Sequence, residues 1–74
     1  MNEARPLDAL NNSRHKRVVV ELKNGRQYIG NLKAFDMHMN IVLEGVEEWV
    51  NGEMKRKQSN IFIRGDAVVV IFPQ

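Results

Sequence analysis

The chain of 74 residues has no cysteine and only two histidines. Without cysteine there are no disulfides, thiolate zinc sites or cysteine nucleophiles. His15 and His38 lie too far apart in the sequence to indicate a metal site. No apolar run is long enough to span a membrane, and no signal peptide is visible. We therefore expect a cytoplasmic protein with no cofactor and no metal.

The formal net charge is only +2, which argues against a protein whose whole surface is basic and binds nucleic acid without a defined site. The charge is nevertheless uneven, with basic runs at 14–17 and 55–57 and an acidic run at 44–48. Such basic runs are either solvated surface or local contact sites for nucleic acid. A chain of this length, 1–74, makes one domain with a small core. Association with other copies is the remaining way to stabilise it.

The N-terminal part predicts a short helix over 6–13. Pro6 suits the first helical turn, where its missing N–H would be unpaired in any case. Leu7 and Leu10 are three residues apart and share one face. Two turns are not stable alone in water, so this helix must lie against a larger element.

Five segments rich in β-branched and apolar residues follow the helix, at 18–22, 26–35, 41–50, 53–63 and 67–72. Asn-Gly pairs at 24–25 and 51–52 predict tight hairpin turns. Gly30, in the middle of the second strand, predicts a sharp bend or a close approach of another backbone. Residues 18–72 therefore predict a strongly bent, five-stranded antiparallel sheet that nearly closes into a barrel.

The last strand, 67–72, is apolar on both faces, as expected of a strand that is covered on both sides. It also ends an incompletely closed sheet, where an exposed apolar edge invites pairing with another chain. A neighbouring copy that offers its own edge would cover it. Contacts of this head-to-tail kind close into rings.

Two short turns, in segments 35–40 and 63–66, carry residues suited to base recognition: Asp36, His38, Asn40, Arg64 and Asp66. If the two turns are neighbours, these side chains gather at one rim. A flat base could be sandwiched between His38 and Arg64. The Asn40 amide would match the donor and acceptor of uracil, and an ionised Asp36 would hold that amide in one orientation.

Other interpretations of the same residues stay open. A histidine in a turn is often simply solvated, and Asp and Asn favour turns for backbone reasons. The Arg-Gly-Asp triplet at 64–66 also occurs in integrin ligands, but three residues are a weak match and the chain has no extracellular signs. Catalysis is not expected, because the pattern offers no nucleophile, metal site or glycine-rich phosphate loop.

The motifs as a whole resemble the Sm/LSm family, most closely its archaeal Sm-like members. Segment 18–44 carries the residues of the first family motif in order: Gly25, Gly30, Leu32, Asp36, Met39, Asn40 and Leu43. Segment 61–71, centred on Arg64 and Gly65, matches the second motif. Residues 5–10 are similar to the start of archaeal members. The resemblance covers nearly the whole chain.

The resemblance implies an all-β fold with a short N-terminal helix on a strongly bent, five-stranded, SH3-like barrel of the Sm type. It implies a homoheptameric ring joined through strands at about 54–63 and 67–72. It also implies a ribonucleoprotein that binds uridine-rich single-stranded RNA at the inner rim of the pore. The RNA-binding residues would be Asp36, His38, Asn40, Arg64, Gly65 and Asp66, with His38 and Arg64 stacking, Asn40 reading uracil and Asp66 shaping its turn.

An assembly module that acts mainly through protein partners is the alternative function. The sequence leaves open the ring size, the RNAs that are bound, and a role in RNA processing, decay or assembly. The roles of Trp49 and of the basic run at 55–57 are open as well.

Overall fold

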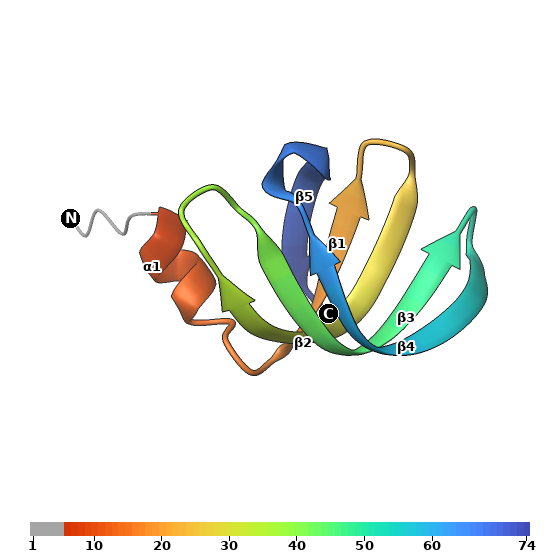
Figure 1. Cartoon of the computed structure of the whole chain (residues 1–74), viewed down its shortest axis with the longest axis horizontal. Coiled ribbons are helices and arrows are strands. Elements are labelled where there is room, and N and C mark those ends of the chain that lie inside the picture. Colours follow the sequence, from red (N-terminus) through yellow and green to blue (C-terminus); the bar gives the residue numbers. More distant parts are fainter. Residues whose placement is uncertain (1–5) are drawn as a thin grey trace.

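The computed structural model describes residues 6–74 of the chain (Figure 1). Its elements in order are α1 (Pro6–Asn11), β1 (Arg17–Leu22), β2 (Arg26–Phe35), β3 (Ile41–Val50), β4 (Glu53–Ile63), the short 3-10 helix η1 (Gly65–Ala67) and β5 (Val68–Pro73). Residues 1–5 of the predicted domain lie outside the described part, and so do the side chains of Pro6 and Leu7. The predicted helix and five antiparallel strands are confirmed.

The five strands form one antiparallel sheet in the order β4-β3-β2-β1-β5. The sheet is so strongly bent that it wraps around its own inner face, as Figure 1 shows. That face holds the core: Val18, Val20, Tyr28, Leu32, Ile41, Leu43, Val46 and Ile63. β4 and β5 are the two edges, so the barrel is not closed by a ladder between them.

α1 is anchored beside the barrel by Leu10, which packs against the core. It ends at Asn11, earlier than the predicted end at residue 13. The chain then continues in turns, because Ser13 N donates to the Leu10 carbonyl at 2.9 Å. Within residues 6–74, no helix has the length and apolar composition needed to cross a membrane.

Gly30 lies where β2 bends across β3. A Cβ at this position would come within 3.1 Å of both the Glu44 carbonyl oxygen and Val46 Cγ2. The register between β2 and β3 also shifts between Ile29 and Asn31. The predicted bend and close backbone approach are therefore both present at Gly30.

A second glycine, Gly45, changes which residues of β3 face the core. Before it, Ile41 and Leu43 are buried; after it, the buried residues are Val46 and Glu48. Strict alternation along the strand would place residue 47 inside instead. Gly45 adopts a φ of +62°, a left-handed conformation that favours glycine, and this irregularity moves the alternation by one residue.

Both edge strands expose large apolar side chains. Phe62 on β4 is 80% exposed and Val69 on β5 is 61% exposed. Of the β5 residues, only Val68 and Ile71 pack against the core. The last strand thus presents apolar surface on its outer side, as the sequence predicted, and this surface is uncovered in the single chain.

Candidate functional site

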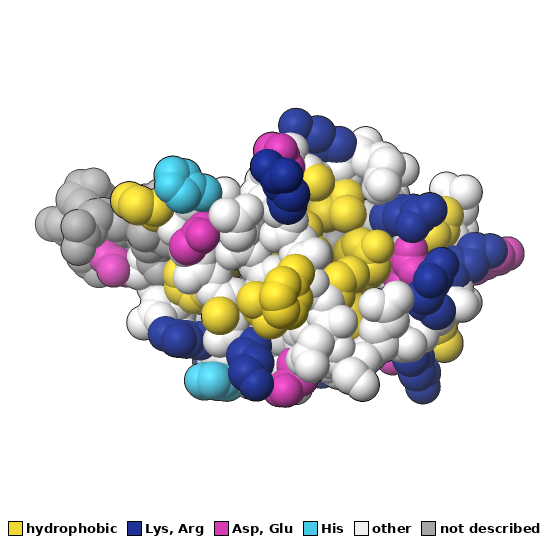
Figure 2. All heavy atoms as spheres, viewed as in Figure 1, with side chains coloured by type: hydrophobic (Ala, Val, Ile, Leu, Met, Phe, Trp, Pro, Cys, Tyr) yellow, Lys and Arg dark blue, Asp and Glu magenta, His cyan; other side chains and the backbone are white. Residues whose placement is uncertain are grey.

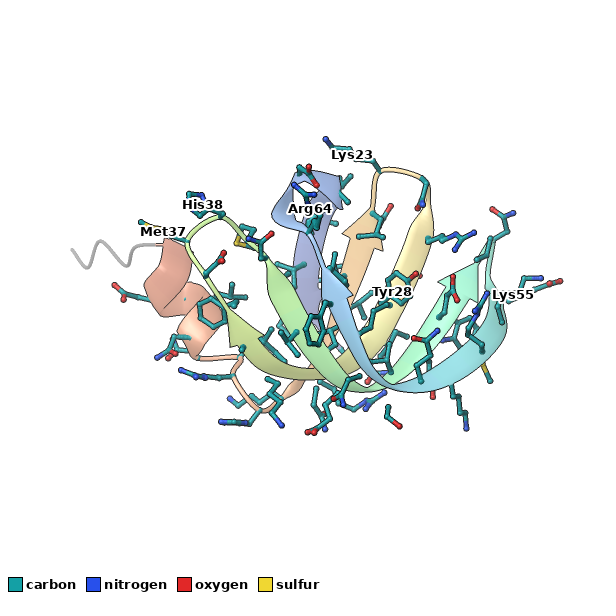
Figure 3. The ribbon with its side chains drawn as sticks, in the orientation of Figure 1. Lys23, Tyr28, Met37, His38, Lys55 and Arg64 are labelled. Carbon is teal, nitrogen blue, oxygen red and sulfur yellow. The ribbon has the colours of Figure 1, made fainter. Side chains whose placement is uncertain are left out.

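Two turns meet at one edge of the barrel: the β2–β3 turn at 36–40 and the β4–β5 turn at 64–67. Gly65 N donates a hydrogen bond of 2.8 Å to Asn40 Oδ1. A Cβ at Gly65 would overlap the carbonyl oxygen of His38, so the two backbones are in direct contact. Figure 3 shows His38 and Arg64 on these turns at the same edge. The structure therefore brings the two turns together, as predicted.

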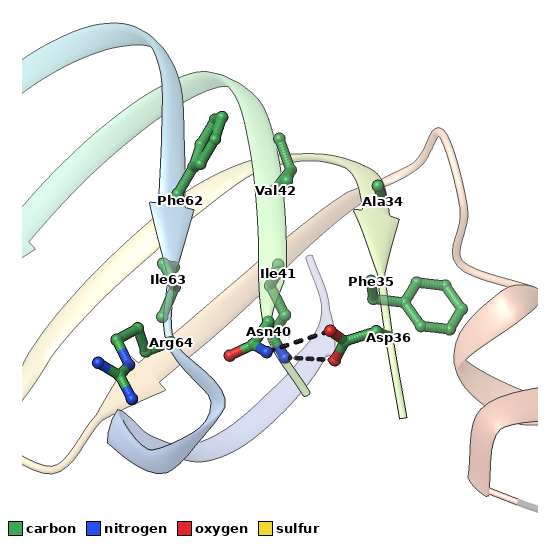
Figure 4. Close-up of a pocket in the computed structure, with 9 residues that line it drawn as sticks. All are labelled: Ala34, Phe35, Asp36, Asn40, Ile41, Val42, Phe62, Ile63 and Arg64. Atoms are coloured by element: carbon green, nitrogen blue, oxygen red, sulfur yellow. Dashed lines mark hydrogen bonds between the residues drawn. The ribbon is translucent and has the colours of Figure 1, made fainter. Parts of the chain in front are cut away.

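The Asp36 carboxylate organises the first turn from within. Its Oδ1 accepts hydrogen bonds from His38 N at 2.9 Å and Asn40 N at 3.1 Å. Its Oδ2 accepts from Asn40 Nδ2 at 3.1 Å. Figure 4 shows both bonds to Asn40. These bonds accompany a tight turn in which Met39 adopts a φ of 63°.

The same hydrogen bonds favour the ionised form of Asp36. The bond from the Asn40 side chain is the largest cause, and it lowers the pKa of Asp36 below its ordinary value of 3.8. Desolvation is the second-largest cause and opposes it by raising the pKa, whereas the backbone hydrogen bonds from Asn40 and His38 lower the pKa further. Asp36 is therefore a pure acceptor at neutral pH.

This assignment predicts the acid titration of Asp36. Because its pKa is lower in the folded chain, ionisation stabilises the turn above the ordinary pKa, and this stabilisation is lost as the pH falls through the lowered pKa. An NMR titration of the Asp36 carboxyl carbon should give a midpoint below 3.8. Asn40→Ala should raise the midpoint, since it removes the largest cause. Equal midpoints in the two proteins would contradict the assigned hydrogen bond.

The Asn40 side-chain amide has only one orientation that satisfies its neighbours. Its Nδ2 faces the Asp36 carboxylate, which can only accept, and its Oδ1 faces the Gly65 N–H, which can only donate. Each amide atom has capacity for one more hydrogen bond. The site thus presents one fixed donor and one fixed acceptor side by side.

His38, Arg64 and Asp66 lie on the same two turns as this amide, and all three are exposed, as Asn40 is. The Arg64 side chain is 85% exposed, and its Nη2 lies 3.7 Å from Asp66 Oδ2. A solvent-exposed pair at that distance contributes little, so Arg64 can rearrange around a ligand. Asp66 lies in η1, within the turn that it was predicted to shape. Stacking by His38 and Arg64 stays a prediction.

A shallow, mainly apolar pocket adjoins the amide on the outer side of β2, β3 and β4 (Figure 4). It is lined by Ala34, Phe35, Asp36, Asn40, Ile41, Val42, Phe62, Ile63 and Arg64. The pocket connects the polar site to the exposed Phe62 on the edge strand. Among residues 6–74, no group of three or more His, Cys, Asp or Glu is arranged to hold a metal ion.

One charged cluster was not singled out by the sequence. Glu48 is buried on the inner face and pairs with Arg26 and Arg56. The signal that could have found it is Gly45, since an irregular glycine in a strand marks a place where alternation can change. Trp49 lies on the other face, and its Nε1 donates to Glu47 Oε1 at 3.0 Å.

Comparison with known proteins identifies the family. Residues 8–73 match the LSM domain, and the chain belongs to this family. An snRNP Sm-like protein of Archaeoglobus fulgidus is 51% identical over 69 residues, which cover 93% of this chain and 90% of the relative. The resemblance to archaeal Sm-like proteins is confirmed.

Solved structures agree with this membership. A Pyrococcus abyssii Sm protein, determined in complex with a uridine heptamer, is 41% identical and superposes with a TM-score of 0.91 over 96% of this chain and all of that one. The Sm protein heptamer of P. aerophilum is 33% identical, with a TM-score of 0.90 over 99% of this chain and 97% of that one. The Sm-type barrel of the present chain is therefore shown by sequence and structure together.

Proposed function

We propose that this chain assembles into a homo-oligomeric ring, most simply of seven copies, that binds uridine-rich single-stranded RNA at the rim formed by its two polar turns. The observation that carries the proposal is the fixed Asn40 amide. Its free acceptor matches uracil N3–H, and its free donor matches a uracil carbonyl oxygen. Cytosine and adenine present the reverse order. Guanine presents its donor and acceptor in the same order as uracil, so the amide alone does not exclude it. Guanine would have to be excluded because the larger purine does not fit the site.

Stacking supplies the sequence-independent part of the proposed binding. His38 and Arg64 are exposed at the same edge and have flat side chains that can lie against a base. Gly65 provides the N–H that holds Asn40, and Asp66 belongs to the same turn. A single site of this kind is shallow, so useful affinity requires several sites on one strand.

Assembly would provide those repeated sites. The two sheet edges, β4 and β5, expose Phe62 and Val69, and a head-to-tail contact between copies would cover both. The relatives support this arrangement, since Sm proteins of the same fold are heptamers and one was solved with a uridine heptamer. The ring would then act in the cytoplasm as an RNA scaffold or chaperone during RNA processing or turnover.

The test is the dependence of affinity on strand length. Uridine monophosphate should bind weakly, whereas a uridine heptamer should bind about 10²–10⁴-fold more tightly, because linked sites raise avidity without new contacts. Competition binding with uridine and cytidine strands gives the base preference, and native mass spectrometry of the same sample gives the number of copies.

Two outcomes would contradict the proposal. Equal affinity for the monophosphate and the heptamer would exclude multivalent binding. An intact ring without affinity for oligouridine would favour the alternative, an assembly module that acts through protein partners.

A further inference from the structure

A second cluster of charged residues lies at the opposite end of β3 from Asn40. The Glu48 carboxylate, with only 5% of its side chain exposed, pairs with Arg26 Nη1 and Arg56 Nε, each at 2.8 Å. The Tyr28 hydroxyl donates to Glu48 Oε2 at 3.4 Å. The cluster joins β2, β3 and β4, and basic side chains gather over this part of the molecule in Figure 2.

The two arginines have more donors than Glu48 can use. Each guanidinium has five N–H groups, whereas the ion pairs involve one nitrogen of each. Their side chains are 46% and 62% exposed, so the remaining donors can reach a ligand in solvent. Two cations and one anion leave the cluster with a net charge of +1. The buried carboxylate holds both guanidiniums in place, which lowers the entropy cost when they bind an anion.

Only one residue of the basic run at 55–57 belongs to this cluster. Lys55 pairs with Glu53 at 3.0 Å instead. Lys57 lies opposite Glu47 in the β3–β4 register, on the face that alternates with that of Arg56. The run is therefore three separate side chains in different environments, of which Arg56 alone contacts the buried carboxylate.

We propose that Arg26 and Arg56, held by Glu48, bind a backbone phosphate of an RNA strand that continues beyond the base-reading rim. This inference rests on the proposed function. Arginine matches phosphate with paired N–H donors, and phosphate contacts position a strand without reading its sequence. Glu48 lies eight residues along the chain from Asn40. Eight residues of straight strand span about 26 Å, and the bend of β3 shortens this distance, so one longer strand can reach both places.

In a head-to-tail assembly we expect the cluster to stay accessible. β5 has six residues and β4 has eleven, so a neighbour's β5 cannot cover the whole of β4. The exposed Phe62 lies near the end of β4 that leads into the base-reading rim. Arg56 lies toward the other end and points over the inner face to Glu48.

The test compares Arg56→Gln with Lys57→Gln, which removes the same charge from the next residue on the opposite face. Both are measured against a uridine heptamer and a longer uridine-rich strand at several salt concentrations. Arg56→Gln should leave the affinity for the heptamer unchanged but lower the affinity for the longer strand. A plot of the logarithm of that affinity against the logarithm of the salt concentration should become less steep, by about 0.7 for each phosphate that the variant no longer neutralises. Lys57→Gln should leave both affinities and the slope unchanged. Arg56→Lys should be intermediate, since it keeps the charge but not the planar donor pair.

Several results would overturn the phosphate site. Equal effects of Arg56→Gln and Lys57→Gln would mean that only the overall positive charge of the surface matters. An unchanged salt dependence of the affinity in Arg56→Gln would exclude a phosphate contact at this residue. NMR signals of the arginine Nε–H groups provide a test in the unaltered protein, even if a variant fails to fold. Longer RNA should shift the Arg26 and Arg56 signals, whereas shifts with inorganic phosphate alone would assign the site to free phosphate. Failure of the unaltered protein to bind the heptamer would instead refute the proposed function.

Discussion

Replacing Gly65 by alanine is expected to abolish most of the affinity for oligouridine while the five-stranded sheet remains folded. The added Cβ would overlap the His38 carbonyl oxygen and lie 2.9 Å from the carbonyl carbons of His38 and Met39. These are backbone atoms, so no side-chain rotation relieves the overlap. The two turns must separate, and Asn40 Oδ1 then loses the Gly65 N–H that helps to hold it. Repeated around a ring, this loss should lower affinity for a uridine heptamer by at least about 10²-fold.

The control for Gly65→Ala is Gly52→Ala. Gly52 has a φ of +80°, so alanine there is strained, but its Cβ would meet nothing within 4 Å and the turn is remote from the site. Thermal unfolding and native mass spectrometry should show folded rings for both variants, and only Gly65→Ala should lose oligouridine binding. Normal binding by an intact Gly65→Ala ring would mean that the site does not need direct contact between the two turns.

The turn contact at Gly65 illustrates which parts of the site could be predicted from the sequence. Asp36, Asn40 and the Arg64–Gly65 pair were identified because turn signals and strand patterns place them between predicted strands. The support of the Asn40 amide by Asp36 also follows from their chemistry and agrees with the structure. The second support, from Gly65 N, depends on how two turns distant in the sequence meet. Only the bend of the sheet determines that contact.

The Glu48 cluster shows a different limit. Local patterns predicted the strand at 41–50 correctly, but they could not tell which of its two adjacent glutamates would be inside. The positive φ of Gly45 decides this by moving the alternation one residue along. The burial of Glu48 then depends on cations from two other strands, Arg26 on β2 and Arg56 on β4. Such a cluster is a tertiary property, whereas the strands and hairpins are local ones.

The change Asp36→Asn should remove the preference for uridine over cytidine without breaking the ring. The Asp36 carboxylate accepts hydrogen bonds from His38 N, Asn40 N and Asn40 Nδ2. An amide at this position has one oxygen. If that oxygen keeps the two backbone donors, its NH2 group faces the NH2 group of Asn40, and the two donors oppose each other. A flip of the Asn40 amide would relieve this conflict but would turn its Nδ2 toward the Gly65 N–H, which is again a donor. Neither orientation satisfies all partners.

Competition between uridine and cytidine heptamers measures the effect of Asp36→Asn. Since the loss of a hydrogen bond at each copy multiplies across linked sites, the uridine-to-cytidine affinity ratio should fall by about tenfold or more. The matched control is Asp66→Asn, the same chemical change in the other turn, where the carboxylate lies 3.7 Å from Arg64 Nη2. It should keep the ratio of the unaltered protein. Native mass spectrometry should show the same ring for all three proteins. If the ratio is unchanged in Asp36→Asn, Asp36 only accepts the backbone hydrogen bonds that shape its turn, and the Asn40 amide is held in its orientation by Gly65 alone.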